Sequence, residues 1–170
     1  MYHITAIGNR KEDIFLCNDD RRMYLNLIKY TQVKVGYKLH AYCLMSNHIH
    51  LLIETIDSPP GKILQLLHLN YSKHFNKKYK HVGHVFQNRY YDKIIMDHFY
   101  FTSACSYIHL NSSRESLVEY ENDTLWSSHN YYLKGESNSL MTKELLLSYL
   151  PYKNYRDWFT SQKVISLKEN

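Results

Sequence analysis

Two histidines separated by one residue are the first feature of this chain that could do chemistry. His48 and His50 flank Ile49 at the start of the apolar run 49–53. Because side chains alternate along a strand, both imidazoles would lie on the same face of it. Imidazole is a common metal ligand, so the pair is a candidate metal site. A bare His-x-His pattern is, however, more often two hydrogen-bonded histidines at a half-buried position.

A tyrosine and an asparagine four residues apart are the second candidate. Tyr107 and Asn111 would share one face of a predicted helix. A tyrosine hydroxyl can act as a nucleophile on phosphorus, and an amide carbonyl can join two imidazoles around a metal ion. Spacing alone does not place Tyr107 near His48, and a packed tyrosine is the commoner interpretation of such a residue.

Length and composition indicate a globular protein with a basic surface. The 170 residues fit one domain with an appended tail, and the formal charge of +5 with a pI near 8.9 favours a polyanionic partner. Seventeen tyrosines are unusual, and tyrosines beside lysines can provide stacking surfaces for unpaired bases.

Three features predict a cytoplasmic protein. The cysteines Cys17, Cys43 and Cys105 are widely spaced without paired-ligand spacing, as in a reduced intracellular protein. Charged residues at 10–13 interrupt the N-terminal stretch, so it is not typical of a signal peptide. No apolar run approaches the roughly 20 residues needed to cross a bilayer.

Hydrophobic periodicity predicts an α+β fold. The expected strands are residues 1–8, residues 37–45, a strand that starts at residue 48 and is stopped by residues 57–61, and residues 90–96. The expected helices run from about residue 18 to Gly36, over about 62–79, and from a third start that Asp97 caps. The order β-α-β-β-α-β is the split β-α-β, or ferredoxin-like, arrangement: an antiparallel sheet with two helices on one face. The first and third strands would be central, so His48 and His50 would lie on a central strand.

The C-terminal part has a weaker pattern. Residues 141–150 and 155–162 predict two short helices separated by Pro151. We therefore expect a catalytic domain over 1–134 and a helical extension over 135–170.

Several separated motifs resemble one protein family. They are 45–54 (Met-Ser-Asn-His-Ile-His-Leu-Leu-Ile-Glu), 107–111 (Tyr-Ile-His-Leu-Asn), 2–5, 19–21, 71–76, 83–90 and 126–128. In this order they closely resemble the single-tyrosine HUH transposases, and most of all the subgroup called REP-associated tyrosine transposases. The resemblance covers most of the chain, whereas a lone His-x-His would be a weak signal.

The resemblance implies a specific function and site. It implies a metal-dependent transposase that cleaves and rejoins single-stranded DNA, with hairpin-containing DNA as the expected partner. Tyr107 would be the nucleophile that stays attached to the 5′ phosphate, and His48, His50 and Asn111 would bind Mg²⁺ or Mn²⁺. Ligand type alone would also permit zinc.

Three positions depart from the family pattern. Ser46 and Ser112 stand where the subgroup usually has proline, and many insertion-sequence relatives have glutamine at the position of Asn111. None of these changes removes a catalytic group, and the asparagine favours the REP-associated subgroup.

Other residues are predicted to support DNA binding or the site. The candidate phosphate contacts are Lys73, Lys77, Lys78, Arg89 and Lys93. The lysines near the end of the second helix are also compatible with an ordinary solvated face. Tyr90 and Tyr91 are predicted either to stack on bases or to fill the sheet. Glu54 shares the strand face with the histidines and is predicted to orient one of them, whereas His109 faces away from Tyr107 and is predicted to be structural.

Two alternatives to an active enzyme remain open from the sequence. One is a ferredoxin-like nucleic-acid-binding protein without catalysis, and the other is a domesticated, inactive transposase that binds hairpins. Both a monomer and a homodimer are compatible with the resemblance.

Overall fold

Four strands form one antiparallel sheet in the computed structural model, which describes residues 1–114, 126–135, 138–151 and 154–168. The strands are β1 (Tyr2–Ile7), β2 (Tyr37–Leu44), β3 (His48–Thr55) and β4 (Tyr91–Ile94), and their order in the sheet is β2-β3-β1-β4. This order confirms the ferredoxin-like prediction, including the central position of β1 and β3.

A tight turn between β2 and β3 sets the position of the histidine strand. The backbone N–H of Met45 donates to the carbonyl of His48 over 2.9 Å, which closes the hairpin. The register then pairs Leu44 with Ile49 and Cys43 with His50. On the other side of β3, His50 pairs with Thr5 and His48 with Ile7.

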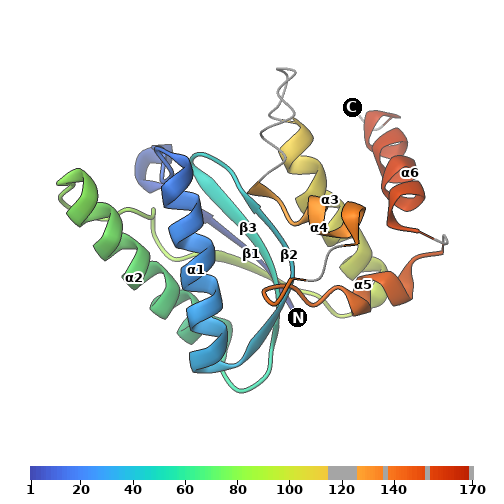
Figure 1. Ribbon diagram of the computed structural model, residues 1–170, viewed down its shortest axis with the longest axis horizontal. Coiled ribbons are helices and arrows are strands. Elements are labelled where there is room, and N and C mark those ends of the chain that lie inside the picture. The colour runs from blue at the N-terminus through green and yellow to red at the C-terminus, as the bar shows by residue number, and fades with distance from the viewer. Residues whose placement is uncertain (115–125, 136–137, 152–153, 169–170) are drawn as a thin grey trace.

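Helices α1 (Asn18–Val35) and α2 (Pro60–Tyr79) cover one face of the sheet (Figure 1). α1 starts at the predicted acidic segment and ends at Gly36, whose φ of 60° suits a residue without a Cβ. α2 begins at Pro60, two residues before the predicted start, because proline lacks an N–H that the first helical turn would leave unpaired.

Helix α3 (His98–Arg114) packs against the opposite face of the sheet, chiefly against β2 and β3. The Asp97 carboxylate accepts a hydrogen bond of 2.8 Å from the N–H of Tyr100, as expected of an N-cap. Strand β4 is shorter than the predicted 90–96, because β1 provides partners only from Tyr2 to Thr5. α3 does not extend over β4, and all four residues of β4 are exposed.

Three further helices pack beside α3: α4 (His129–Lys134), α5 (Glu144–Tyr149) and α6 (Tyr155–Lys168) (Figure 1). Helix α5 is thus shorter than the predicted helix over 141–150, and α6 is longer than the predicted helix over 155–162. A buried polar cluster joins α3 to α6, since the Tyr155 hydroxyl lies 2.7 Å from both His109 Nδ1 and His129 Nδ1. His109 Nε2 also lies 2.7 Å from Ser128 Oγ, which agrees with a structural role for His109. The division at residue 134 stays a prediction.

Within the described ranges, no helix combines the length and the apolar character that a membrane span requires.

Candidate functional site

The β3 histidines lie together on the sheet face that α3 covers. The ring centroids of His48 and His50 are 5.1 Å apart with an interplanar angle of 86°. His50 is buried, with 4% of its surface exposed, whereas His48 at the strand start is half-buried. The strand alternation expected from the sequence is therefore present in the structure.

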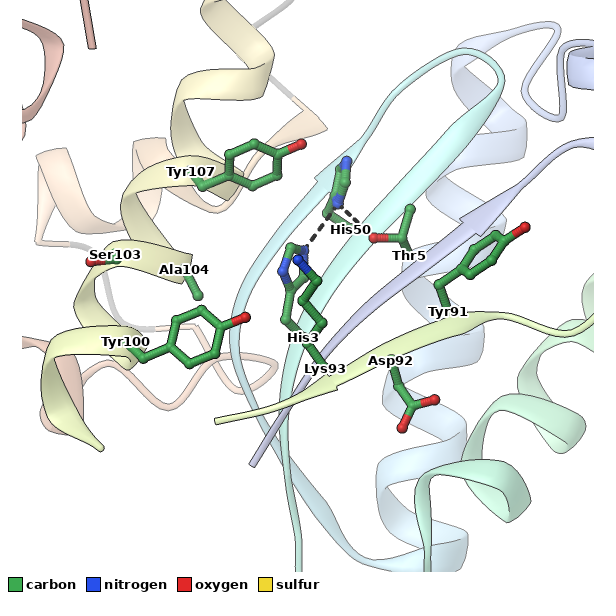
Figure 2. Close-up of a pocket in the computed structure, with 10 residues that line it drawn as sticks. All are labelled: His3, Thr5, His50, Tyr91, Asp92, Lys93, Tyr100, Ser103, Ala104 and Tyr107. Atoms are coloured by element: carbon green, nitrogen blue, oxygen red, sulfur yellow. Dashed lines mark hydrogen bonds between the residues drawn. The ribbon is translucent and has the colours of Figure 1, made fainter. Parts of the chain in front are cut away.

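Hydrogen-bond partners at Nδ1 hold both histidines of β3 in place. His48 Nδ1 lies 2.7 Å from the Asn47 side-chain oxygen, an acceptor, so Nδ1 carries the proton. His50 Nδ1 lies 3.1 Å from His3 Nε2 and 3.2 Å from Thr5 Oγ1 (Figure 2). With the proton on Nδ1, each imidazole would present a lone pair at Nε2, the form in which histidine binds a metal ion. Metal-binding histidines are commonly oriented in this way.

Burial keeps His50 and His3 neutral at neutral pH. The pKa of His50 falls to about 3, first because of burial and then because His3 and His48 lie nearby. The pKa of His3 falls to about 4 for the same first reason, with the Lys93 charge as the second cause. A neutral imidazole is the form that binds metal ions.

Helix α3 brings Tyr107 to the histidines. The Tyr107 ring centroid is 5.5 Å from that of His50, at 87°, and 5.7 Å from that of His3, at 62°. Tyr107 is 43% exposed, so its hydroxyl is accessible. Its neighbours Cys105 and Ser106 are buried and face the core. The tertiary structure thus brings the nucleophile candidate Tyr107 next to His50, although the two residues are far apart in the sequence.

Asn111 lies one helical turn after Tyr107. Its amide nitrogen donates to the Tyr107 carbonyl over 3.1 Å, which leaves the amide carbonyl oxygen as a possible ligand. Imidazole nitrogens and amide oxygens are both ligands that divalent ions take in proteins. Across the described segments, no three His, Cys, Asp or Glu side chains form a group that could hold a metal.

Glu54 corrects one sequence-based expectation. Its carboxylate accepts hydrogen bonds from Lys38 Nζ at 3.1 Å and from His40 Nε2 at 3.0 Å. Glu54 therefore orients the buried His40 and not His48 or His50. The expectation followed correctly from strand alternation, but the carboxylate is close to the neighbouring strand β2 and bonds there.

Lys78 has a carboxylate partner within the protein. Its ammonium group lies 2.6 Å from Oδ1 of the fully buried Asp20, and this ion pair joins α2 to the start of α1. Lys78 therefore has a structural role, and its contact with DNA stays a prediction.

The remaining basic candidates fall into two groups. Lys73 and Lys77 are exposed on α2, on the sheet face opposite Tyr107 (Figure 1). Arg89 is exposed and donates to the hydroxyl of its neighbour Tyr90, while Lys93 lies on β4 beside the histidines. Only Lys93 of these candidates lines the same cavity as Tyr107.

His3, Thr5 and Tyr100 also line this cavity and were not singled out as site residues. Alternation along 2–5 would have placed His3 and Thr5 on one face of the first strand. The pairing of Thr5 with His50, however, is a register between distant strands that the sequence does not specify.

A histidine pair on a central strand of a ferredoxin-like sheet, with a tyrosine on the helix that crosses it, is the combination that the sequence motifs suggested. Residues 1–111 match the family model for IS200-like transposases, and the chain therefore belongs to this family.

The fold is that of a REP-associated tyrosine transposase. The solved structure of such a protein, bound to a REP hairpin, is similar to this chain with a TM-score of 0.64 and 13% sequence identity. The match covers 90% of this chain and 88% of that protein's chain. A crystal structure of a proposed transposase from Deinococcus radiodurans matches with a TM-score of 0.47 and 15% sequence identity. This match covers 60% of this chain and 83% of the Deinococcus chain. No curated protein sequence matches this chain.

Proposed function

We propose that this protein is a metal-dependent tyrosine transposase that cleaves and rejoins single-stranded DNA containing hairpins. The observation that carries the proposal is the contact between Tyr107 and His50, whose ring centroids are 5.5 Å apart. It combines an exposed phenol with an imidazole held for metal binding, in a chain that belongs to a transposase family.

Tyr107 is the proposed nucleophile. Its phenol oxygen attacks phosphorus, a new O–P bond forms, and the bond from phosphorus to the 3′ oxygen breaks. The phenol proton leaves to solvent, and the departing oxygen takes up a proton to become a free 3′ hydroxyl. The 5′ phosphate stays on Tyr107 as a phosphodiester, so a 3′ hydroxyl can later reverse the reaction without ATP.

His48, His50 and Asn111 are the proposed ligands of Mg²⁺ or Mn²⁺. A bound divalent ion would polarise the scissile phosphate and offset its developing negative charge. His50 is held by His3 and Thr5, and His48 by Asn47, so the protein fixes both rings before the ion arrives.

A DNA hairpin is the proposed substrate for two reasons. The structural neighbour of the same fold is a transposase bound to a REP hairpin. This chain is also basic, and exposed lysines on α2 offer phosphate contacts away from the site.

A covalent-adduct assay tests the proposal. A hairpin oligonucleotide labelled at its 3′ end is incubated with the protein and Mn²⁺, because the 3′ fragment is the one that stays attached. We expect a labelled adduct whose phosphopeptide maps to Tyr107. Tyr107→Phe removes one oxygen and should abolish the adduct, while Tyr30→Phe, at an exposed tyrosine on α1, is the matched control and should retain it.

Two results would count against the proposal. An adduct on any other tyrosine would refute the assignment of Tyr107. Binding of several hairpins without any adduct would instead support a hairpin-binding protein without catalysis.

A further inference from the structure

A groove continues from Tyr107 between α3 and β4. The sheet register places Thr5 beside His50 on β3 and beside Tyr91 on β4, and it places His3 beside Lys93. These side chains share one face of the sheet, because paired residues of antiparallel strands point the same way. His3 and Thr5 therefore form the floor of the groove, and β4 forms one wall.

Helix α3 forms the second wall. Tyr100, Ala104 and Tyr107 follow at spacings of four and three residues, so they share one helix face. Tyr100 and Tyr107 both point from α3 towards β1 in Figure 2, with the small Ala104 between them. The cavity that these residues line has a volume of about 410 Å³, within the range of roughly 300–1,000 Å³ typical of ligand sites.

Both walls carry accessible aromatic rings. Tyr100 on α3 is 37% exposed, and Tyr91 on the edge strand β4 is 60% exposed. Their exposure follows from the short β4, which α3 leaves uncovered. Accessible aromatic faces in a groove are typical of surfaces that stack unpaired bases.

The groove also carries one positive charge. Lys93 projects beside His3, whereas the carboxylate of its neighbour Asp92 points away from His3 (Figure 2). Among the described residues, no carboxylate forms an ion pair with Lys93. A lysine in this position is suited to a phosphate group.

We propose that this groove binds one unpaired nucleotide that directly flanks the cleaved phosphate. Its base stacks on Tyr100, and Lys93 contacts its phosphate on the side of β4. The inference rests on the proposed function, because Tyr107 at one end of the groove defines where the cleaved phosphate lies. It adds a binding site for a single flanking base, separate from the contacts that hold the hairpin.

Photocrosslinking tests where the base lies. A hairpin oligonucleotide with unpaired tails is prepared in versions that each replace one tail thymidine by 5-iododeoxyuridine, which crosslinks to aromatic rings in stacking contact. After irradiation without added metal, the crosslinked peptide is mapped by mass spectrometry. We expect one tail position next to the cleavage point to crosslink to Tyr100. Crosslinks confined to residues outside the groove would overturn the proposal.

Affinity measurements test whether the base site contributes to binding. Tyr100→Ala removes the ring on which the base stacks. This change should weaken tail-dependent DNA binding roughly 5- to 150-fold. Tyr100→Phe keeps the aromatic face and should bind like the parent protein. Tyr30→Ala is the matched control, because Tyr30 is 47% exposed on α1, on the other side of the sheet. Equal affinities for Tyr100→Ala and Tyr30→Ala would overturn the proposal.

The two proposals fail in different ways. An adduct at Tyr107 together with crosslinks only outside the groove would support the proposed enzyme activity and refute the base-binding site. A crosslink at Tyr100 with no adduct at Tyr107 would support the groove as a nucleic-acid-binding site and refute the cleavage activity.

Discussion

His3 Nε2 lies 3.1 Å from His50 Nδ1, across the two central strands β1 and β3. The same His50 nitrogen lies 3.2 Å from Thr5 Oγ1. These neighbours fix the orientation of the His50 ring through its Nδ1 and leave Nε2 on the far side of the ring from them. The first strand therefore supports the proposed metal ligand on the third strand.

This arrangement predicts that His3 affects metal binding. His3→Ala should weaken Mn²⁺ binding about 10- to 100-fold, because His50 loses a partner that orients it. Mn²⁺ affinity can be measured directly by electron paramagnetic resonance titration, without any DNA. His84→Ala changes an exposed histidine outside the cavity and is the control. Unchanged Mn²⁺ affinity in His3→Ala would mean that Thr5 alone orients His50.

The histidine pair should be needed for cleavage and not for hairpin binding. His48→Ala or His50→Ala should abolish the covalent adduct, because each removes one proposed ligand. Hairpin affinity should change little, since phosphate and base contacts elsewhere supply it. Adduct formation and gel-shift affinity are measured on the same samples, with and without EDTA. Full cleavage in EDTA would contradict the metal assignment.

The exposed α2 lysines should contribute a salt-dependent part of DNA affinity. The double change Lys73→Glu and Lys77→Glu should weaken hairpin binding and reduce the slope of log affinity against log salt by about 0.7–0.9 for each DNA phosphate that the protein no longer neutralises. The measurement is a binding titration at several salt concentrations. Lys134→Glu reverses a lysine charge on a different helix and serves as the comparison. An unchanged slope would identify the α2 lysines as a solvated surface.

The Asp20–Lys78 pair should stabilise the fold. Burial alone would raise the pKa of Asp20, but hydrogen bonds from Lys78, Tyr79 and two backbone amides outweigh it and lower the pKa below 3.8. Its contribution is therefore complete above the unfolded pKa and is lost as pH falls through the lower folded value. Asp20→Asn should cost about 1–3 kcal/mol in the free energy of unfolding at pH 7.

Denaturant titrations at pH 7 and below pH 4 measure this effect. The difference between Asp20→Asn and the parent protein should shrink in acid, where the parent also loses the carboxylate charge. Asp19→Asn, which changes an exposed carboxylate one position earlier, should stay close to the parent protein throughout. A constant difference across this pH range would contradict the role of the charge.

The neutral histidine His68 should make the protein sensitive to mild acid. Burial lowers the pKa of His68 from 6.5 to about 3, so the unfolded chain takes up a proton that the folded protein excludes. Stability is therefore complete above pH 6.5 and falls between 6.5 and about 3, by at most about 1.4 kcal/mol per pH unit for each such group. His68→Gln should reduce this slope in denaturant titrations from pH 7 to pH 5. An equal slope in both proteins would contradict the prediction.

The sequence by itself determined the class of fold and most of the proposed chemistry. Hydrophobic periodicity predicted the strand and helix order, and the order limited the topology to the split β-α-β arrangement. Strand and helix periodicity placed His48 with His50 on one strand face and Tyr107 with Asn111 on one helix face, because these periods are readable without distant contacts. The roles of ligand and nucleophile came from the resemblance of these motifs to a transposase family, since spacing alone favoured structural residues.

Only the tertiary structure decided which distant groups meet. The pairing of β1 with β3 placed His3 and Thr5 beside His50, and a one-residue slip would have turned them to the other face. The same kind of contact directed Glu54 to His40 and Lys78 to Asp20, because each charged group bonds to the nearest partner that packing provides. The groove beside Tyr107 likewise depends on where β1 stops pairing with β4 and on which strands α3 covers. Contacts between segments far apart in the chain follow from tertiary packing, and a local sequence pattern does not predict them.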